Sequence, residues 1–109
     1  MTKEEYKKQL TKLQEEFDNK RKQLDIMWAN ERNQIRIGDV IKDHIGRGVV
    51  TKIHLYNGIH QMPMCKYWVT IVNKDGSVTK RNEKERYIYQ CNVKQINDKP
   101  YAYERESLG

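Results

Sequence analysis

Asp39, Asp43 and His44 lie within the stretch IRIGDVIKDHIGRGVV, residues 35–50, and their side chains can ligate a metal. Their spacing matches none of the recurrent ligand patterns of metal sites, and adding the other histidines or Cys65 does not complete one. Aspartate also suits turns, because its carboxylate accepts hydrogen bonds from nearby backbone amides. We therefore predict a structural role for these residues and no metal site.

The same stretch contains Gly46-Arg47-Gly48, a pattern that also occurs in loops that bind phosphate groups. Phosphate-binding loops carry a further glycine and open a helix whose N-terminus faces the anion. Here the glycines precede a run of β-branched residues, which predicts a strand. We expect Gly46 and Gly48 to let the backbone turn, Asp43 to hold the turn and Arg47 to project from its tip, with no cofactor.

No combination of residues predicts catalysis. The chain has no nucleophile elbow, no carboxylate pair in an apolar setting and no cysteine–histidine spacing of a known type, although His60 and Cys65 are close in sequence. A chain of 109 residues, 37% of them hydrophobic, also has little volume for a deep substrate pocket. We expect a binding protein without enzymatic activity and without catalytic residues.

The positive charge of the chain is unevenly distributed. Residues 35–97 carry 11 lysines and arginines against 5 acidic residues, an excess equal to the net charge of the whole chain, +6. This excess predicts a polyanionic partner, with basic side chains on phosphates and an aromatic ring stacked on a base. If Tyr67 and Tyr89 point inward, Trp68 points outward with Thr70. The candidate residues for nucleic-acid or polyanion binding are Arg47, Lys74, Lys80, Arg81, Lys84, Arg86, Trp68 and Tyr87.

The N-terminal segment predicts one long helix. Thr2 to Asn33 contains neither glycine nor proline, strong helix formers dominate, and Thr2 and Glu5 have the spacing of a capping box. Apolar residues recur in alternating steps of four and three, the heptad pattern of a coiled coil, with Lys20 at one core position. These residues, which we call the seam, are Tyr6, Leu10, Leu13, Phe17, Leu24 and Met27.

A helix of about 30 residues is about 45 Å long, far longer than a small β domain can cover. Packing on the rest of the chain would reach only the last two turns, near Leu24, Met27 and Trp28. We expect the remaining seam to form a homo-oligomer, with docking onto a different protein as the alternative. The number of chains and their orientation stay open at this point.

After Asn33 the apolar period changes to two, which predicts strands. We expect them at residues 35–41, with a break at Gly38–Asp39, and at 49–56, 67–72, 78–81 and 86–91, while 92–96 forms a last short strand or a turn. Val49, Thr51, Ile53 and Leu55 are expected on one face, and a tight turn is expected at residues 73–76. Because an open sheet of such short strands exposes its edges, a small antiparallel barrel is favoured. The expected fold class is α+β. A long N-terminal amphipathic, coiled-coil-like helix (1–34) is followed by an SH3-like β-barrel (35–97) and a C-terminal tail (98–109).

Two resemblances accompany this pattern. GDVI followed by GRGVV resembles the opening of SH3-like barrels of the KOW and Tudor kind. GDVIKDHIG and KYWVTIVNKDGSVTKRNEKERYIYQCNV, within residues 38–93, resemble a family of short uncharacterised proteins from gut bacteria and their phages or mobile elements. The features of that family are GD-I-x-D-H-x-G, a K-x-D-G hairpin, Y-Q-x-N and a charged helix in front, and the hairpin of this chain departs from the pattern as Lys74-Asp75-Gly76. This second resemblance implies a compact module and no known activity.

Two functions stay open from the sequence. The first is a non-enzymatic module in which a basic barrel on a helical oligomer binds nucleic acid or another polyanion. The alternative is a protein-interaction inhibitor or adaptor of the phage or mobile-element type, acting on a host protein such as a defence enzyme or sequestering a nucleotide signal. A purely structural spacer is a third reading.

The expected compartment is the cytoplasm. No run of about 18 apolar residues that could span a membrane occurs, and MTKEEYKKQL at the start has no apolar stretch of a signal peptide. We therefore expect no membrane partner. Cys65 and Cys91 are expected to be free thiols, because a reducing cytosol disfavours a disulfide.

Overall fold

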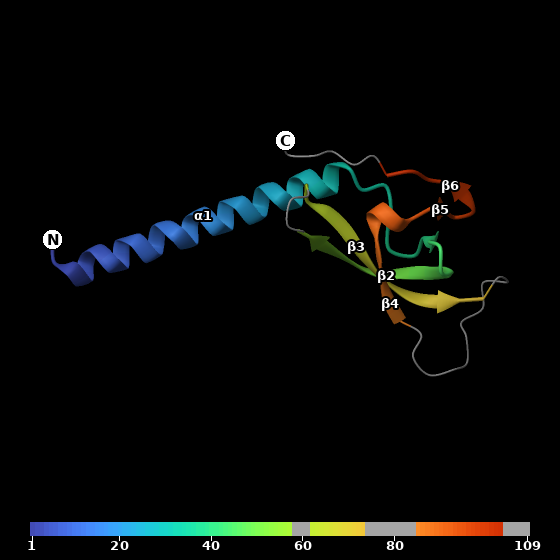
Figure 1. Cartoon of the computed structure of the whole chain (residues 1–109), viewed down its shortest axis with the longest axis horizontal. Helices are drawn as coiled ribbons and strands as arrows, with labels where there is room; N and C mark the ends of the chain where they lie inside the picture. Colours follow the sequence, from blue (N-terminus) through green and yellow to red (C-terminus); the bar gives the residue numbers. More distant parts are fainter. Residues whose placement is uncertain (58–61, 74–84, 104–109) are drawn as a thin grey trace.

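One long helix extends away from a small antiparallel sheet in the computed structural model, which describes residues 1–57, 62–73 and 85–103 (Figure 1). The helix is α1 (Lys3–Glu31). The strands are β1 (Val40–Lys42), β2 (Arg47–Tyr56), β3 (Met64–Val72), β4 (Glu85–Tyr89), β5 (Gln95–Ile96) and β6 (Lys99–Pro100), and a short 3-10 helix, η1 (Gln90–Asn92), follows β4. The predicted α+β class is confirmed.

Helix α1 begins at the predicted cap. Thr2 Oγ1 accepts a hydrogen bond from the Glu5 amide at 3.2 Å, which satisfies one of the free amides of the first turn. At the other end Asn33 turns the chain, because its amide group donates to the Ile35 carbonyl at 2.8 Å and accepts from the Ile35 amide at 3.0 Å. Across the described residues, no helix has both the length and the apolarity to span a membrane.

The sheet has the strand order β4-β3-β2-β1-β5-β6, and all neighbours are antiparallel. Strands β4 and β6 are its two edges, so the described sheet is open and is not the closed barrel that we predicted. Strands β1, β5 and β6 have only three, two and two residues, which gives too few paired positions to carry the sheet around to β4. Strand β6 lies in the segment predicted as a tail and pairs with β5.

The alternation of inward and outward side chains along β2 differs from the prediction because of a β-bulge. The register with β3 shifts between Val50 and Lys52, which leaves Thr51 without a partner in the ladder. Val50 therefore points into the core, where it is 1% exposed, while Val49 and Thr51 do not. An extra residue exchanges the two faces of a strand, so the expectation of one face for Val49, Thr51, Ile53 and Leu55 is wrong for the first two.

The core lies between the inner face of the sheet and the last turn of α1. Its members are buried apolar residues, of which Ala29 comes from α1 and the others from the strands and loops: Ile35, Ile41, Val50, Cys65, Tyr67, Val69, Ile88 and Val93. The Tyr67 hydroxyl donates to the side chain of Asn33, which fastens the end of the helix to β3. The core is thus covered by α1 on one side, although the sheet does not close.

Gln90 is a buried polar residue that connects three segments. Its side-chain oxygen accepts from the Cys65 amide at 3.1 Å, and its side-chain nitrogen donates to the Arg32 carbonyl at 2.9 Å and to the Tyr101 hydroxyl at 3.1 Å. These bonds satisfy backbone groups that would otherwise lose hydrogen bonds on burial. Both cysteines are free, Cys65 buried and Cys91 half-buried.

Candidate functional site

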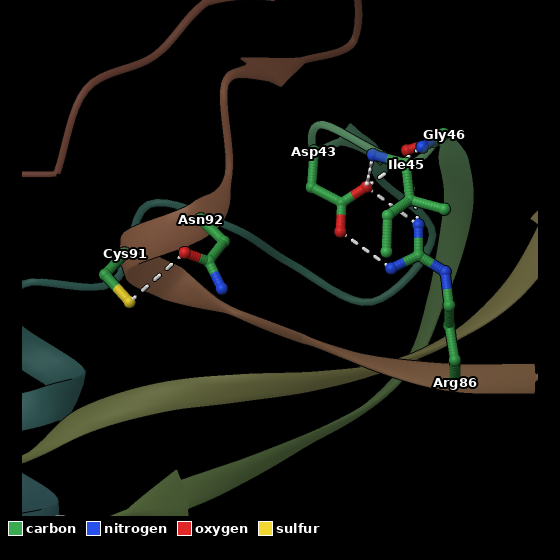
Figure 2. Close-up of polar contacts among 6 residues, drawn as sticks. All are labelled: Asp43, Ile45, Gly46, Arg86, Cys91 and Asn92. Atoms are coloured by element: carbon green, nitrogen blue, oxygen red, sulfur yellow. Dashed lines mark hydrogen bonds and ion pairs between the residues drawn. The ribbon is translucent and has the colours of Figure 1, made fainter.

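Asp43 organises the turn between β1 and β2. Its carboxylate accepts hydrogen bonds from the amides of Ile45 at 2.9 Å and Gly46 at 3.0 Å, and its own amide donates to the Gly46 carbonyl at 3.0 Å (Figure 2). Arg86 of β4 approaches from the side, with its two terminal nitrogens 2.7 and 2.8 Å from the two carboxylate oxygens. The carboxylate that the sequence offered as a possible metal ligand therefore binds backbone amides and a guanidinium.

The Asp43–Arg86 pair is largely removed from water, with the side chains 4% and 21% exposed. Burial alone would raise the pKa of Asp43. The hydrogen bonds from Arg86, Gly46 and Ile45 outweigh burial and lower the pKa from 3.8 to about 2. The hydrogen bond to Asp43 raises the pKa of Arg86, against the opposing effect of burial. Arg86, a predicted polyanion-binding residue, is thus occupied by an internal carboxylate.

The other residues of the stretch 35–50 also have structural contacts. Asp39 accepts from the Arg36 amide at 2.9 Å and from the Asn97 side chain at 3.2 Å, so it joins the start of β1 to the β5–β6 turn. Arg47, the predicted loop-tip cation, lies 3.3 Å from the carboxylate of Asp98, which is 74% exposed. Arg47 is the first residue of β2 and its side chain is 29% exposed, so it does not project from a loop tip as predicted.

Gly48 has a different role from the one predicted. Its backbone is not in the left-handed region, and a β-carbon built on it would lie 2.5 Å from Cγ2 of Val69 on β3. Glycine is needed here because β2 and β3 approach closely, and the buried Val69 cannot move aside. The positive φ of this stretch, +96°, belongs to Gly38, whose amide donates to the Val50 carbonyl at 2.8 Å.

A basic and aromatic surface covers the outer face of β2, β3 and β4. The register places Lys52 beside Trp68 and Trp68 beside Tyr87, and in the next row it places His54 beside Lys66 and Lys66 beside Tyr89. Residues directly opposite each other in antiparallel strands share a face. We call these residues, together with Tyr56, the outer aromatic face: Lys52, His54, Tyr56, Lys66, Trp68, Tyr87 and Tyr89.

The rings of this face touch one another. The Tyr87 ring lies 4.6 Å from Trp68 and 5.9 Å from His54, both edge-on, and Tyr56 lies 4.8 Å from Tyr89. The Lys66 ammonium is 4.6 Å from the centre of the Tyr87 ring. Tyr87 is 39% exposed, so the ring at the centre of the group is open to a partner.

The predicted orientations are confirmed for two of three aromatic residues. Tyr67 points into the core and is fully buried, and Trp68 lies on the opposite face with Thr70. Tyr89 was expected inward, but it shares the outer face with Lys66. The Trp68 indole donates to the Glu85 carboxylate at 3.0 Å, which fixes the plane of its ring.

An open cleft of about 620 Å³ adjoins the outer aromatic face at the end of α1. His54, Lys66 and Tyr87 belong to both the cleft and the face, and Lys22 adds a second ammonium from the helix. The remaining lining residues are Ile26, Ala29, Asn30, Ile53, Leu55 and Cys65. Among the described residues that line the cleft, two are lysines and none carries a carboxylate, so this lining favours an anionic group.

The predicted binding residues are only partly brought together. Trp68 and Tyr87 are in contact, Arg86 faces Asp43, and Arg47 lies by Asp98. The other four candidates, Lys74, Lys80, Arg81 and Lys84, lie outside the described residues.

Sequence reasoning missed five members of the outer aromatic face: Lys52, His54, Tyr56, Lys66 and Tyr89. The predicted alternation already placed Lys52 and His54 on the face opposite Ile53 and Leu55, but the sequence does not indicate that this face lies beside Trp68 and Tyr87, because that depends on the pairing of β2 with β3 and of β3 with β4. Lys66 next to an aromatic pair was the one available signal. Comparison of the chain with known proteins finds no matching family model, no matching curated protein and no matching solved structure.

Proposed function

We propose that the protein binds single-stranded nucleic acid on the outer aromatic face. One observation carries this proposal: Trp68, Tyr87 and His54 form a continuous row of rings across three strands, with Lys52 beside Trp68 and Lys66 over the Tyr87 ring. Unpaired bases stack on exposed aromatic rings irrespective of sequence, and lysines along the same path neutralise the phosphates.

The charges on and around the outer aromatic face favour a polyanionic ligand. Lys52 and Lys66 lie on the face and Lys22 lies at the edge of the cleft, while Glu85, the acidic residue that contacts the face, is engaged by the Trp68 indole. The chain as a whole carries a net charge of +6. A positive surface raises the rate of encounter with nucleic acid and gives an affinity that falls with salt.

Single strands are favoured over duplexes because the face offers rings rather than a protruding element. A duplex buries its base faces inside the stack, so the rings could reach only the phosphates and groove edges. The strand order also supports a relation to SH3-like domains, since β4, β3, β2, β1 and β5 follow one another as neighbours and η1 precedes β5. In this proposal the unit is an SH3-like sheet that remains open.

The test is a binding titration with labelled single-stranded and double-stranded DNA and RNA of equal length over a series of salt concentrations. Single strands should bind more tightly than duplexes. Replacing Tyr87 by alanine should weaken binding about 5- to 150-fold, the effect of losing the stacking of one base. Tyr87→Phe keeps the ring and should bind like the wild type. A dissociation constant weaker than about 100 μM at low salt for every ligand would refute the proposal.

Two double variants that remove the same amount of charge distinguish binding at the outer aromatic face from attraction by the total charge of the chain. Lys52→Gln with Lys66→Gln should lower the slope of log affinity against log salt by about 1.4, because each phosphate contact on a single strand contributes about 0.7. Lys8→Gln with Lys12→Gln removes the same charge from exposed positions of α1 and should leave affinity nearly unchanged. Equal losses in both double variants would contradict a localised site.

The alternative is a protein-interaction inhibitor or adaptor, and the exposed apolar seam of α1 is the observation that favours it. Capture of the tagged protein's partners with and without nuclease distinguishes the two. A stoichiometric protein partner that survives nuclease, together with no affinity for single strands, would favour the alternative.

A further inference from the structure

The seam of α1 is exposed along its whole length. Its six apolar side chains are between 41% and 65% exposed: Tyr6, Leu10, Leu13, Phe17, Leu24 and Met27. The expectation that the sheet would cover the last two turns is wrong for Leu24 and Met27, while Trp28 is half-buried.

The geometry of the helix explains why the sheet leaves the seam open. Ile26 and Ala29 face the β-strands, as members of the cleft and, for Ala29, of the core. Successive residues of an α-helix turn by about 100°, so the line through Leu24 and Met27 lies about 160° around the axis from the line through Ile26 and Ala29. The sheet and the seam therefore occupy opposite sides of α1, and a partner on the seam does not meet the sheet.

The exposed seam is large for an isolated chain. Its six side chains expose on the order of 700 Å², whereas the largest apolar patch of a typical monomer is about 300–600 Å². A standard protein interface buries about 800 Å² on each partner, so the seam has the size of one half of an interface. A regular heptad of this length fits another helix with the same repeat.

We infer that the seam binds the seam of a second copy of this chain, with the two helices parallel. In the heptad the core positions a are Leu10, Phe17 and Leu24, and the residues flanking the core are the e and g positions. In a parallel pair, residue g of one helix faces residue e of the following heptad in the other. Glu16 occupies g and Arg21 occupies e, so the twofold symmetry places one carboxylate–guanidinium pair on each side of the core.

The antiparallel arrangement lacks this complementarity. It brings e positions against e positions and g positions against g positions, and the e positions include Lys7 and Arg21 while Glu16 is the charged g residue among the described heptads. Like charges then face each other or meet neutral residues. Lys20 at a core position weakens the association in either orientation.

The molar mass in solution tests the association. Light scattering after size exclusion should give twice the 13.1 kDa of one chain, with dissociation on dilution. Leu13→Glu in the seam should yield a monomer, whereas Asn19→Glu, exposed and outside the seam, should retain the wild-type mass. A wild-type monomer at about 100 μM, or a Leu13→Glu variant with unchanged mass, would overturn the inference.

Charge exchange tests the orientation. Glu16→Arg and Arg21→Glu should each weaken self-association, whereas mixing the two variants should give a heterodimer in which every flanking pair is again of opposite sign. Each variant replaces one charged residue by another, so the helix should form as in the wild type. Helicity measured by circular dichroism is the folding control. In an antiparallel pair each single change would only exchange one like-charged contact for another, so unchanged self-association of both single variants would exclude the parallel arrangement. Neither experiment depends on nucleic-acid binding, so the two proposals fail or stand separately.

Discussion

Replacement of Asp43 by asparagine should destabilise the protein in a pH-dependent manner. The variant retains an oxygen for the amides of Ile45 and Gly46 but leaves the Arg86 guanidinium, 21% exposed, without its negative partner. Breaking a fully buried ion pair costs about 3–5 kcal/mol. Because Arg86 is partly exposed and water can solvate it, the expected loss of stability is smaller, about 2–3 kcal/mol at neutral pH.

The pKa gives the pH window and a second route to the magnitude. The pKa of Asp43 is lowered from 3.8 to about 2 in the folded protein. The ionised carboxylate therefore stabilises the fold fully above pH 3.8, and this stabilisation is lost as the pH falls through about 2. A shift of this size corresponds to about 2 kcal/mol above pH 5, about 1 kcal/mol at pH 3 and under about 0.5 kcal/mol at pH 2.

Urea denaturation followed by tryptophan fluorescence at several pH values measures both quantities. The difference between wild type and Asp43→Asn should be largest at neutral pH and should shrink towards pH 2. Asp98→Asn makes the same chemical change at the exposed Arg47 pair and should alter stability by less than about 0.5 kcal/mol. A difference between wild type and Asp43→Asn that is equal at pH 7 and pH 2 would refute the reasoning from ionisation.

Three further predictions concern the core. Gly48→Ala should destabilise by about 1–3 kcal/mol in urea denaturation, because the new methyl group meets the buried Val69. Val69→Ala has a cost of its own in the core, but the double variant should lose less stability than the sum of the two single variants, because the smaller side chain makes room for the new methyl group. Gln90→Leu should cost about 1–3 kcal/mol, since the Cys65 amide loses its partner on burial; an unchanged urea midpoint would contradict this. In thiol labelling of the native protein Cys91 should react first, because Cys65 is buried and burial raises its pKa, and Cys65 should react at the rate of unfolding.

The two proposals have a joint consequence for affinity. A parallel pair of helices places both sheets at the same end of the assembly, so two outer aromatic faces become available to one strand of nucleic acid. Linked sites raise the apparent affinity without any new contact, provided that the strand spans both. The Leu13→Glu variant should therefore bind long single strands more weakly than the wild type and bind strands that fill one site equally well.

The sequence by itself determined the helix and the class of the fold. The helix could be predicted because its signals are local: a cap at Thr2, no glycine or proline before Asn33, and a heptad repeat whose spacing identifies the seam. Most of β3 was also predictable, since residues 67–72 are all β-branched or aromatic, although the strand begins three residues earlier, at Met64.

Only the tertiary structure decided the faces of the strands and the partners of the charges. A one-residue bulge at Thr51 exchanges inside and outside for the rest of β2, and it depends on the pairing with β3 rather than on the local sequence. Likewise Asp43 and Arg86 lie 43 residues apart, and nothing in their neighbourhoods along the chain indicates that they form a pair. Long-range pairing selects which basic residues remain on the surface, because a charge that finds a buried partner is no longer available to a ligand.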